Sequence, residues 1–326
     1  MKKKLILILS ILLGFVLLIV IILNITPFFD AMLIRKLFNN PDLAPINNYE
    51  SIKDKFTVIE NIEYPSLYKE NVLDIYLPKN DEKPHPVIIW VHGGGFVGGD
   101  KTDLKYYGEA LAVNGYAVIL FNYSRGPETK YPTPLLQVDE VYDWILSQKD
   151  TYNLDIENLI FAGDSAGAQI ASQFVTIQTN IKYSEITRIN QSIPKENIKG
   201  MLLYCGVYDI KMITESNSSK LVNYFLNKAG WAYFGKRDWM KSFQNELSII
   251  NYINSDFPPT FITDGNTFSF EKQARKLAEV LVKNTVEVKE LYFPEDTTTM
   301  HEYQFKMNTP QGEKAYEYTL EFLNSL

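Results

Sequence analysis

Residues 159–167 read Leu-Ile-Phe-Ala-Gly-Asp-Ser-Ala-Gly, and this stretch decides the fold. Its apolar half predicts a buried strand, and the sequence from Gln169 to Thr176 that follows is helix-forming. A strand, a sharp glycine-flanked turn and a helix form a nucleophile elbow, which exposes a serine hydroxyl on a strained turn. Ser165 is therefore the candidate nucleophile. Small residues in a turn also occur where close packing excludes side chains, so the assignment depends on the rest of the chain.

Strands and helices alternate on both sides of this stretch. Residues 87–91 and 117–121 are continuous apolar runs, which are typical of strands buried on both faces of a parallel sheet. Further strands are predicted over 57–64, 72–77, 201–204, 260–263 and 286–293, and helices over 104–114, 135–146, 270–282 and 312–323. This order predicts an α/β fold with a mostly parallel central sheet and helices on both faces.

One long segment interrupts the alternation. Residues 211–256 lie between two predicted strands and carry helix-like sequence that is rich in aromatic residues. An insertion of this length at the carboxyl edge of a parallel sheet is where a cap over an active site would lie. The aromatic side chains would also serve to pack the insertion onto the domain. We therefore predict a helical cap over 211–256 within a domain that spans 56–326.

The N-terminal region predicts a membrane segment. Residues 5–25 are almost all Leu, Ile, Val and Phe, and such a helix would be about 31 Å long, against roughly 30 Å for a hydrocarbon core. Lysines at positions 2–4 favour a cytoplasmic N-terminus, with the rest of the chain outside. We predict a single-pass anchor over 1–26 and a stalk over 27–55. A cleaved signal peptide with a secreted product is the alternative, although its apolar region would usually be about 7 to 15 residues.

Composition narrows the remaining function classes. The chain has 326 residues, of which 46% are apolar, so it can bury a large core. A net charge of −7 and the lack of a basic stripe beyond the N-terminal lysines argue against a nucleic-acid partner and favour a small molecule. Cys205 is the only cysteine, which excludes an intrachain disulfide and a zinc site built on cysteines. The glycine-rich residues 93–99 lack the ending of a P-loop, and we expect neither a cofactor nor a metal. The oligomeric state is left open.

A serine nucleophile needs a base, and the chain contains three histidines. His85 lies between two prolines and is interpreted as an exposed loop residue. His92 opens the sequence His-Gly-Gly-Gly-Phe directly after a buried strand. His301 follows the last predicted strand, at the sheet edge where Ser165 also projects. His301 is therefore the predicted general base.

The glycines after His92 suit a different role. Acyl transfer develops negative charge on a carbonyl oxygen, and preorganised backbone N–H groups stabilise that charge. A run of glycines lets the backbone approach the substrate without obstruction by side chains. Ala166, directly after the nucleophile, supplies a further N–H group. The order of the two motifs thus favours acyl-transfer chemistry over a simple flexible turn.

Four segments together resemble the hormone-sensitive-lipase-like esterases of the α/β-hydrolase fold. They are HGGGF at 92–96, NYSRGPE at 122–128, Tyr-Pro at 131–132 and GDSAG at 163–167, and the similarity runs from about Val72 to the C-terminus. The resemblance implies hydrolysis of carboxylic esters through an acyl-enzyme, with Ser165 as nucleophile and His301 as general base and then acid. It also implies an oxyanion hole formed by the amides of Gly94, Gly95 and Ala166, and structural roles for Arg125, Glu128 and Asp139.

The acid of the triad is where the chain departs from the family pattern. The family commonly carries Gly-x-x-Asp after the strand before the penultimate helix, but here Gly265 is followed at that spacing by Phe268. Asp264 lies one residue before this glycine, and the chain order Ser165, Asp264, His301 is the one that the fold requires. Asp264 is the predicted acid, Asp209 is the alternative, and Glu271 is third. Either aspartate could instead cap a helix or close a turn.

The sequence thus predicts a membrane-anchored serine hydrolase that acts on short-acyl or acetyl esters. Hydrolysis of amides or formamides would use the same triad. A lipase for long acyl chains is compatible with the aromatic insertion and the membrane tether through residues 5–25. A catalytically silent surface-binding module is least favoured, because such proteins typically lose the serine or the histidine and this chain keeps both.

Overall fold

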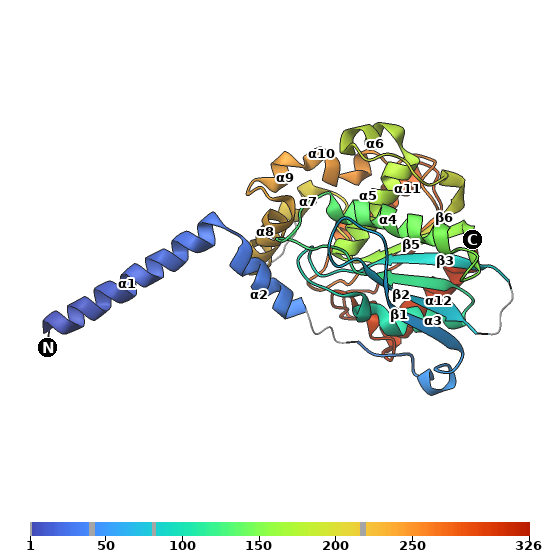
Figure 1. Cartoon of the computed structure of the whole chain (residues 1–326), viewed down its shortest axis with the longest axis horizontal. Coiled ribbons are helices and arrows are strands. Elements are labelled where there is room, and N and C mark those ends of the chain that lie inside the picture. Colours follow the sequence, from blue (N-terminus) through green and yellow to red (C-terminus); the bar gives the residue numbers. More distant parts are fainter. Residues whose placement is uncertain (1, 39–42, 80–82, 216–219) are drawn as a thin grey trace.

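An eight-stranded sheet forms the centre of the computed structural model, which describes residues 2–38, 43–79, 83–215 and 220–326. The strand order is β1-β2-β4-β3-β5-β6-β7-β8. The pairs β1/β2 and β2/β4 are antiparallel, and all other neighbours are parallel. This mixed sheet with helices on both faces is the α/β-hydrolase fold, which confirms the predicted α/β class with a mostly parallel central sheet (Figure 1).

The strands and the main helices lie close to their predicted positions. The strands are β1 (Phe56–Glu63), β2 (Val72–Pro78), β3 (His85–Val91), β4 (Ala117–Phe121), β5 (Leu154–Asp164), β6 (Ile198–Tyr204), β7 (Thr260–Thr263) and β8 (Val288–Leu291). The helices that cover the sheet are α3 (Lys105–Val113), α4 (Thr133–Gln148), α5 (Ala166–Thr179), α6 (Ile181–Thr187), α11 (Glu271–Lys283) and α12 (Pro310–Leu323).

The apolar runs fill two core layers, one on each face of the sheet. Successive side chains of a strand point to opposite faces, so Phe161 of β5 joins the layer under α4, α5 and α11. Its neighbour Ile160 joins the layer formed with α3 and α12. Both side chains are buried. A central strand that is covered on both faces therefore carries the uninterrupted apolar sequence that marked it as a parallel strand.

The N-terminal helix α1 (Lys2–Ile25) projects away from the domain (Figure 1). It has a mean hydropathy of 3.5, and none of it is buried. Its length and composition suffice to cross a membrane, and they are equally consistent with a signal sequence.

The segment predicted as a stalk contains a docked helix, α2 (Phe28–Phe38). Asp30 forms an ion pair of 2.9 Å with Lys228 on α8 and accepts a hydrogen bond from Tyr224 at 2.9 Å. Ala31 and Ile34 are buried in a small apolar cluster with residues of the domain. The description of 27–55 as a stalk is therefore incomplete, because its first helix packs on the domain.

The aromatic insertion forms short helices between β6 and β7. They are α7 (Ile210–Glu215), α8 (Lys220–Phe234), α9 (Trp239–Ser242) and α10 (Gln244–Leu247), and residues 216–219 of the predicted cap lie outside the described residues. Tyr233, Phe234 and Trp239 are buried in a cluster of their own. The ring of Phe96 stacks on Tyr233 at 4.5 Å, so the insertion packs against the glycine-rich loop, residues 92–99.

A buried ion pair secures the far end of the glycine-rich loop. Lys101 Nζ lies 2.7 Å from Asp74 Oδ1, and the two side chains are 5% and 2% exposed. The Lys101 N–H also donates to Asn122 Oδ1 at 2.7 Å. Asp74 lies on β2 and Asn122 directly follows β4, so these two contacts of Lys101 tie the end of the loop to the sheet.

We expect Lys101→Met to lower the free energy of unfolding by about 3–5 kcal/mol, because it leaves an uncompensated buried carboxylate. The double variant Lys101→Met/Asp74→Leu should recover part of this loss. Urea denaturation of each variant measures the effect. Lys53→Ala removes a pair with Glu50 that is exposed on both sides, and it serves as the control with no expected change in midpoint. Equal midpoints for Lys101→Met and the wild type would contradict the structural role of the pair.

Candidate active site

Ser165 occupies a strained turn between β5 and α5. Its φ and ψ angles are 50° and −117°, which is a sparsely populated region for a residue with a side chain. The turn is held by packing: a Cβ atom on Gly167 would lie 2.0 Å from the Val91 carbonyl oxygen. The Ser165 N–H donates to the Tyr204 carbonyl at 2.8 Å. The strand, turn and helix of a nucleophile elbow are therefore present around this serine.

His301 lies beside this serine, in the loop between β8 and the short helix η5 (Tyr303–Phe305). Its Nε2 atom is 2.9 Å from Ser165 Oγ. The edge of the Phe270 ring packs against the imidazole at 5.6 Å. Burial lowers the pKa of His301 below its ordinary value, while the nearby Glu302 carboxylate acts in the opposite direction. A neutral imidazole is favoured at neutral pH, and it can accept the serine proton at Nε2.

Asp264 is fully buried at the end of β7, on the other side of the imidazole. The Ser269 hydroxyl contacts both Asp264 Oδ1 and His301 Nδ1, the latter at 2.7 Å. Burial raises the pKa of Asp264 to about 7, and hydrogen bonds from Ser269 and from the Phe270 N–H act against this rise. The structure thus brings Ser165, His301 and Asp264 together, with a serine between the last two.

The two other carboxylates considered as the acid have local partners. Asp209 accepts the Ser248 hydroxyl at 2.8 Å and the Lys211 N–H at 3.1 Å, which is a capping arrangement at the start of α7. Glu271 pairs with Arg275 at 2.7 Å, one turn later on α11. Their hydrogen bonds in the described residues lead away from His301, in contrast to those of Asp264.

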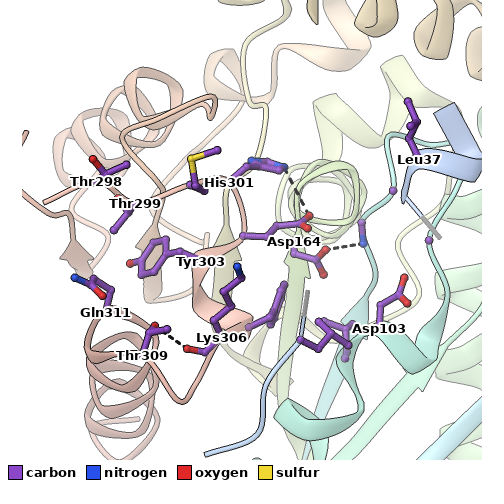
Figure 2. A pocket seen from close by; sticks show the side chains of 18 residues that line it. Leu37, Asp103, Asp164, Thr298, Thr299, His301, Tyr303, Lys306, Thr309 and Gln311 are labelled. Carbon is purple, nitrogen blue, oxygen red and sulfur yellow. Dashed lines mark hydrogen bonds and ion pairs between the residues drawn. The ribbon is translucent and has the colours of Figure 1, made fainter. Parts of the chain in front are cut away.

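The three amides implied as oxyanion donors lie around the elbow. Gly94 and Gly95 have positive φ angles of 108° and 60°, which turn the loop away from an extended course. Ala166 is the first residue of α5, so its N–H has no acceptor within the helix. The buried Asp164 accepts the Gly93 N–H at 2.7 Å (Figure 2). It also accepts the Trp90 Nε1–H at 2.9 Å. Asp164 therefore ties the glycine-rich loop to the residue before the nucleophile.

The other two histidines are structural. His85 was interpreted as an exposed loop residue, and that interpretation is wrong: it is 4% exposed and begins β3, where its N–H donates to the Asn153 carbonyl. The flanking prolines misled the interpretation, because proline is also tolerated at the first positions of a strand. His92 stacks on Tyr123 at 4.3 Å, and burial lowers its pKa to about 4.

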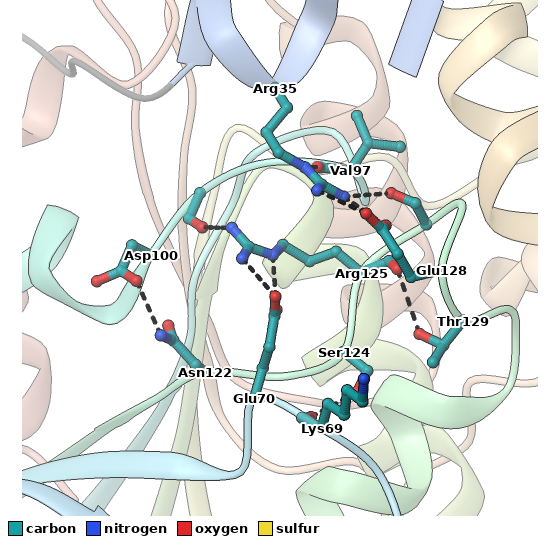
Figure 3. A network of polar contacts seen from close by, with 12 residues as sticks. Arg35, Lys69, Glu70, Val97, Asp100, Asn122, Ser124, Arg125, Glu128 and Thr129 are labelled. Atoms are coloured by element: carbon teal, nitrogen blue, oxygen red, sulfur yellow. Dashed lines mark hydrogen bonds and ion pairs between the residues drawn. The ribbon is translucent and has the colours of Figure 1, made fainter. Parts of the chain in front are cut away.

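Two arginines hold the glycine-rich loop from outside (Figure 3). Arg125 forms a bidentate pair with Glu70 at 2.8 and 2.7 Å and donates to the Gly99 carbonyl. Arg35 of α2 donates to the Val97 carbonyl and forms a bidentate pair with Glu128 at 2.8 and 2.7 Å. These contacts agree with the structural roles implied for Arg125 and Glu128. The sequence analysis did not identify Arg35 or Ser269, since neither lies in a motif of the family.

The third residue with an implied structural role is Asp139 of α4. Its carboxylate accepts the hydroxyl of Ser192, which lies beyond α6, so it links two parts of the helical layer on that face.

A cavity of about 480 Å³ opens beside His301 (Figure 2). Gly93, Gly94 and His301 are among the residues that line it. The rest of its lining is mixed and includes Leu37, Asp103, Thr299, Lys306, Thr309 and Gln311. A substrate group bound here would lie next to the imidazole and would meet both charged and hydroxyl side chains.

The imidazole and two side chains next to it are close enough together to hold a metal ion. The ligand atoms of Cys205, Asp264 and His301 lie within 4.8 Å of one another. Burial raises the pKa of the Cys205 thiol well above its usual value, which disfavours the thiolate that binds metals. Both imidazole nitrogens already have hydroxyl partners, Ser165 and Ser269. The arrangement fits a hydrogen-bonded chain better than a metal centre.

Comparison with known proteins places the chain in a family. The family model BD-FAE matches residues 73–281, which is more than half of the chain. The chain is 26% identical over 231 residues to the acetyl esterase of Salmonella schwarzengrund (strain CVM19633), which covers 67% of the chain and 65% of that relative. It is 26% identical over 187 residues to an esterase of Fusarium pseudograminearum (strain CS3096), covering 56% and 55%. The chain thus spans less than two thirds of the length of these relatives.

Solved structures share the fold at lower identity. Esterase B from Lactobacillus rhamnosis (HN001) superposes with a TM-score of 0.73 at 20% identity, covering 84% of this chain and 87% of that one. The bacterial heroin esterase superposes with a TM-score of 0.67 at 19% identity, covering 82% and 83%. At these identities the likeness establishes the fold. Together with the family model and the HGGGF and GDSAG motifs, it means that the chain belongs to the BD-FAE family, within the hormone-sensitive-lipase-like esterases of the α/β-hydrolase fold.

Proposed function

We propose that the protein is a serine carboxylesterase that hydrolyses short-acyl or acetyl esters through an acyl-enzyme. The observation that carries the proposal is the 2.9 Å contact between Ser165 Oγ, on a strained elbow, and His301 Nε2. A paired nucleophile and base beside a glycine-rich loop supply the parts that acyl transfer needs. The curated relatives reported above carry the names acetyl esterase and esterase.

In this mechanism His301 takes the Ser165 proton as the serine attacks the ester carbonyl. The negative charge that develops on the carbonyl oxygen would be stabilised by the amides of Gly94, Gly95 and Ala166. The imidazolium then donates its proton to the leaving alcohol, and a water molecule deprotonated by the same imidazole releases the acid. Asp264 would act on Nδ1 through the Ser269 hydroxyl that lies between them, so that Nδ1 stays protonated and Nε2 faces the serine with its lone pair.

The cavity beside His301 favours an ester substrate whose alcohol group is polar. Protonation of the leaving group requires the alcohol oxygen to lie near Nε2, and the cavity opens at that residue. Asp103, Lys306 and Thr309 in its lining can form hydrogen bonds with hydroxyl groups, and Leu37, Leu43 and Leu104 add apolar surface. The helical insertion, residues 211–256, would cap the site, because Tyr233 stacks on Phe96 of the glycine-rich loop.

We expect Ser165→Ala to abolish hydrolysis of p-nitrophenyl acetate, lowering kcat by about 10⁶-fold or to background, because the nucleophile is removed. A fluorophosphonate probe should label the wild type and leave the variant unlabelled. Ser147→Ala changes an exposed serine of α4 and is the control that should retain activity and labelling. Turnover that survives in Ser165→Ala would refute the proposal.

The acid can be identified with a pair of matched variants. Asp264→Asn should lower kcat by roughly 10³- to 10⁴-fold with a small change in KM, because histidine loses the charge that orients it. Asp209→Asn should leave kcat within a few-fold of the wild type, since its carboxylate bonds to Ser248 and α7. Steady-state kinetics on one acetyl ester compares the two. The opposite ranking would assign the acid to Asp209.

We also propose that residues 5–25 anchor the protein in a membrane, with the catalytic domain on the extracytoplasmic side. Support comes from the apolar surface of α1, which is exposed along its length, and from the lysines that precede it. The domain division 1–26, 27–55 and 56–326 belongs to the same proposal, with α2 as the docked part of the second segment.

Full-length protein expressed in a bacterial host should stay in the membrane pellet after alkaline carbonate extraction, and deletion of residues 1–25 should release the domain. External protease should reach the domain in spheroplasts, as the predicted orientation requires. N-terminal sequencing of the membrane-bound protein distinguishes an anchor from a cleaved signal. A soluble secreted product that starts after residue 25 would contradict the anchor and identify the N-terminal segment as a cleaved signal peptide.

A further inference from the structure

We propose that Ser269 is a positioning residue that connects the acid to the base, so that the catalytic hydrogen-bonded chain has four members: Ser165, His301, Ser269 and Asp264. This inference rests on the proposed function. Its basis is that one hydroxyl contacts both His301 Nδ1 and Asp264 Oδ1. In the described residues the imidazole has no direct hydrogen bond to Asp264.

The chemistry of a hydroxyl fits this place and fixes the direction of each bond. A serine hydroxyl has one proton to donate and two lone pairs to accept with. When Asp264 is ionised, its carboxylate can only accept, so Ser269 donates to Asp264 Oδ1. Ser269 must then accept the Nδ1–H of His301, which leaves Nε2 unprotonated and ready for the Ser165 proton. The hydrogen-bonded chain therefore selects the His301 tautomer that general-base catalysis requires.

The position of the acid explains why an intermediary is needed. Asp264 directly follows β7, one residue before Gly265, and its carboxylate and the imidazole lie within 4.8 Å of each other. The family pattern places the acid three residues after this glycine, where the chain has Phe268, 73% exposed with a φ of 50°. Ser269 is the next residue, and its side chain turns inward from the same loop. The hydroxyl thus bridges a gap that the displaced acid leaves.

Ser269 is held in place by two loops that are bonded to each other. The Asn266 N–H donates to Thr299 Oγ1 at 3.1 Å, and the Thr299 N–H donates to Asn266 Oδ1 at 3.0 Å. Thr299 lies two residues before His301. The Phe270 N–H, directly after Ser269, donates to Asp264 Oδ1 at 3.3 Å. Because both ends of the bridge are anchored in this way, the Ser269 hydroxyl is preorganised between acid and base.

The ionisable groups around the hydrogen-bonded chain of Ser165, His301, Ser269 and Asp264 determine how its response to pH is interpreted. Glu302 Oε1 lies 3.6 Å from His301 Nε2. The ionisable groups that interact electrostatically with Asp264 are Cys205, Tyr208, Tyr292 and Tyr303. Burial raises the pKa of each of these four, so they are neutral near pH 7. Asp264 has a pKa of about 7, and its bond from Ser269 lowers that value. Loss of the hydroxyl should therefore raise the pKa of Asp264 further.

The test compares Ser269→Ala, Ser269→Thr and Ser248→Ala on an acetyl ester, over a range of pH, in folded protein checked by circular dichroism. Ser269→Ala should lower kcat by about 10- to 100-fold with KM nearly unchanged, less than the loss expected for the acid because the charge remains. Its acidic limb in kcat/KM should move to higher pH. Ser269→Thr keeps the hydroxyl and should restore kcat to within a few-fold. Ser248→Ala removes the hydroxyl beside Asp209 and should alter neither kcat nor the pH profile.

A double variant and a spectroscopic measurement separate this inference from the proposed function. Asp264→Asn/Ser269→Ala should be no slower than Asp264→Asn alone, because both changes break one chain. The wild-type proton NMR spectrum should contain a low-field Nδ1–H resonance that Ser269→Ala shifts or removes, and this readout needs no substrate. Should Ser269→Ala fail to fold, Ser269→Gly replaces it in each comparison. If the wild type is active and the Ser269 variants keep its kcat, its pH profile and the Nδ1–H resonance, the inference about Ser269 is overturned. If the wild type is inactive on esters but shows the resonance, only the proposed esterase function is overturned.

Discussion

The close approach of α5 to the end of β3 is the constraint on which the site depends. At Gly167 the helix backbone passes so near to the Val91 carbonyl that only glycine fits. This contact sets how sharply the chain must turn from β5 into α5, and Ser165 takes its positive φ as a result. A side chain in such a conformation is held there by the packing around it and not by its own preference. The conformation of Ser165, the candidate nucleophile, is therefore set by the tertiary structure, since Val91 is distant in sequence.

The same contact region places the glycine-rich loop, because that loop begins where β3 ends. Asp164 then fixes the loop by accepting the Gly93 N–H, and its other oxygen is satisfied by Trp90. Burial and the neighbouring Glu302 raise the pKa of Asp164 well above its usual value. A buried carboxyl with several hydrogen-bond partners is costly to disturb. Two adjacent residues of the GDSAG motif therefore have different roles: Ser165 is the candidate nucleophile, and Asp164 aligns the glycine-rich loop.

Much of this arrangement could be predicted from the sequence, because it follows from short-range patterns. The apolar runs of β3, β4 and β5 and the elbow motif located the sheet edge, and His301 followed from the order of the strands. The proposed role of Ser269 could not be predicted, because it depends on the distance between the Asp264 carboxylate and the His301 imidazole. A single sequence does not reveal such a distance. Arg35 was missed for a similar reason: it lies 91 or more positions from the Gly126 and Glu128 groups that it binds. His85 was misinterpreted because its prolines are typical of turns as well as of strand ends.

The docked helix α2 gives the proposed anchor a consequence for the site. Arg35 binds the Val97 carbonyl within the glycine-rich loop and, through Glu128, the segment beyond β4. Asp30 binds Lys228 on α8, the helix whose Tyr233 stacks on Phe96 of the same loop. Helix α2, which follows α1, is thus bonded both to the glycine-rich loop and to the insertion beside it. A bidentate pair and a buried ion pair resist rotation better than a flexible linker does. The orientation of α2 relative to the active site is consequently determined by the domain itself, and any tether acting through α1 would act directly on the elements that surround the nucleophile.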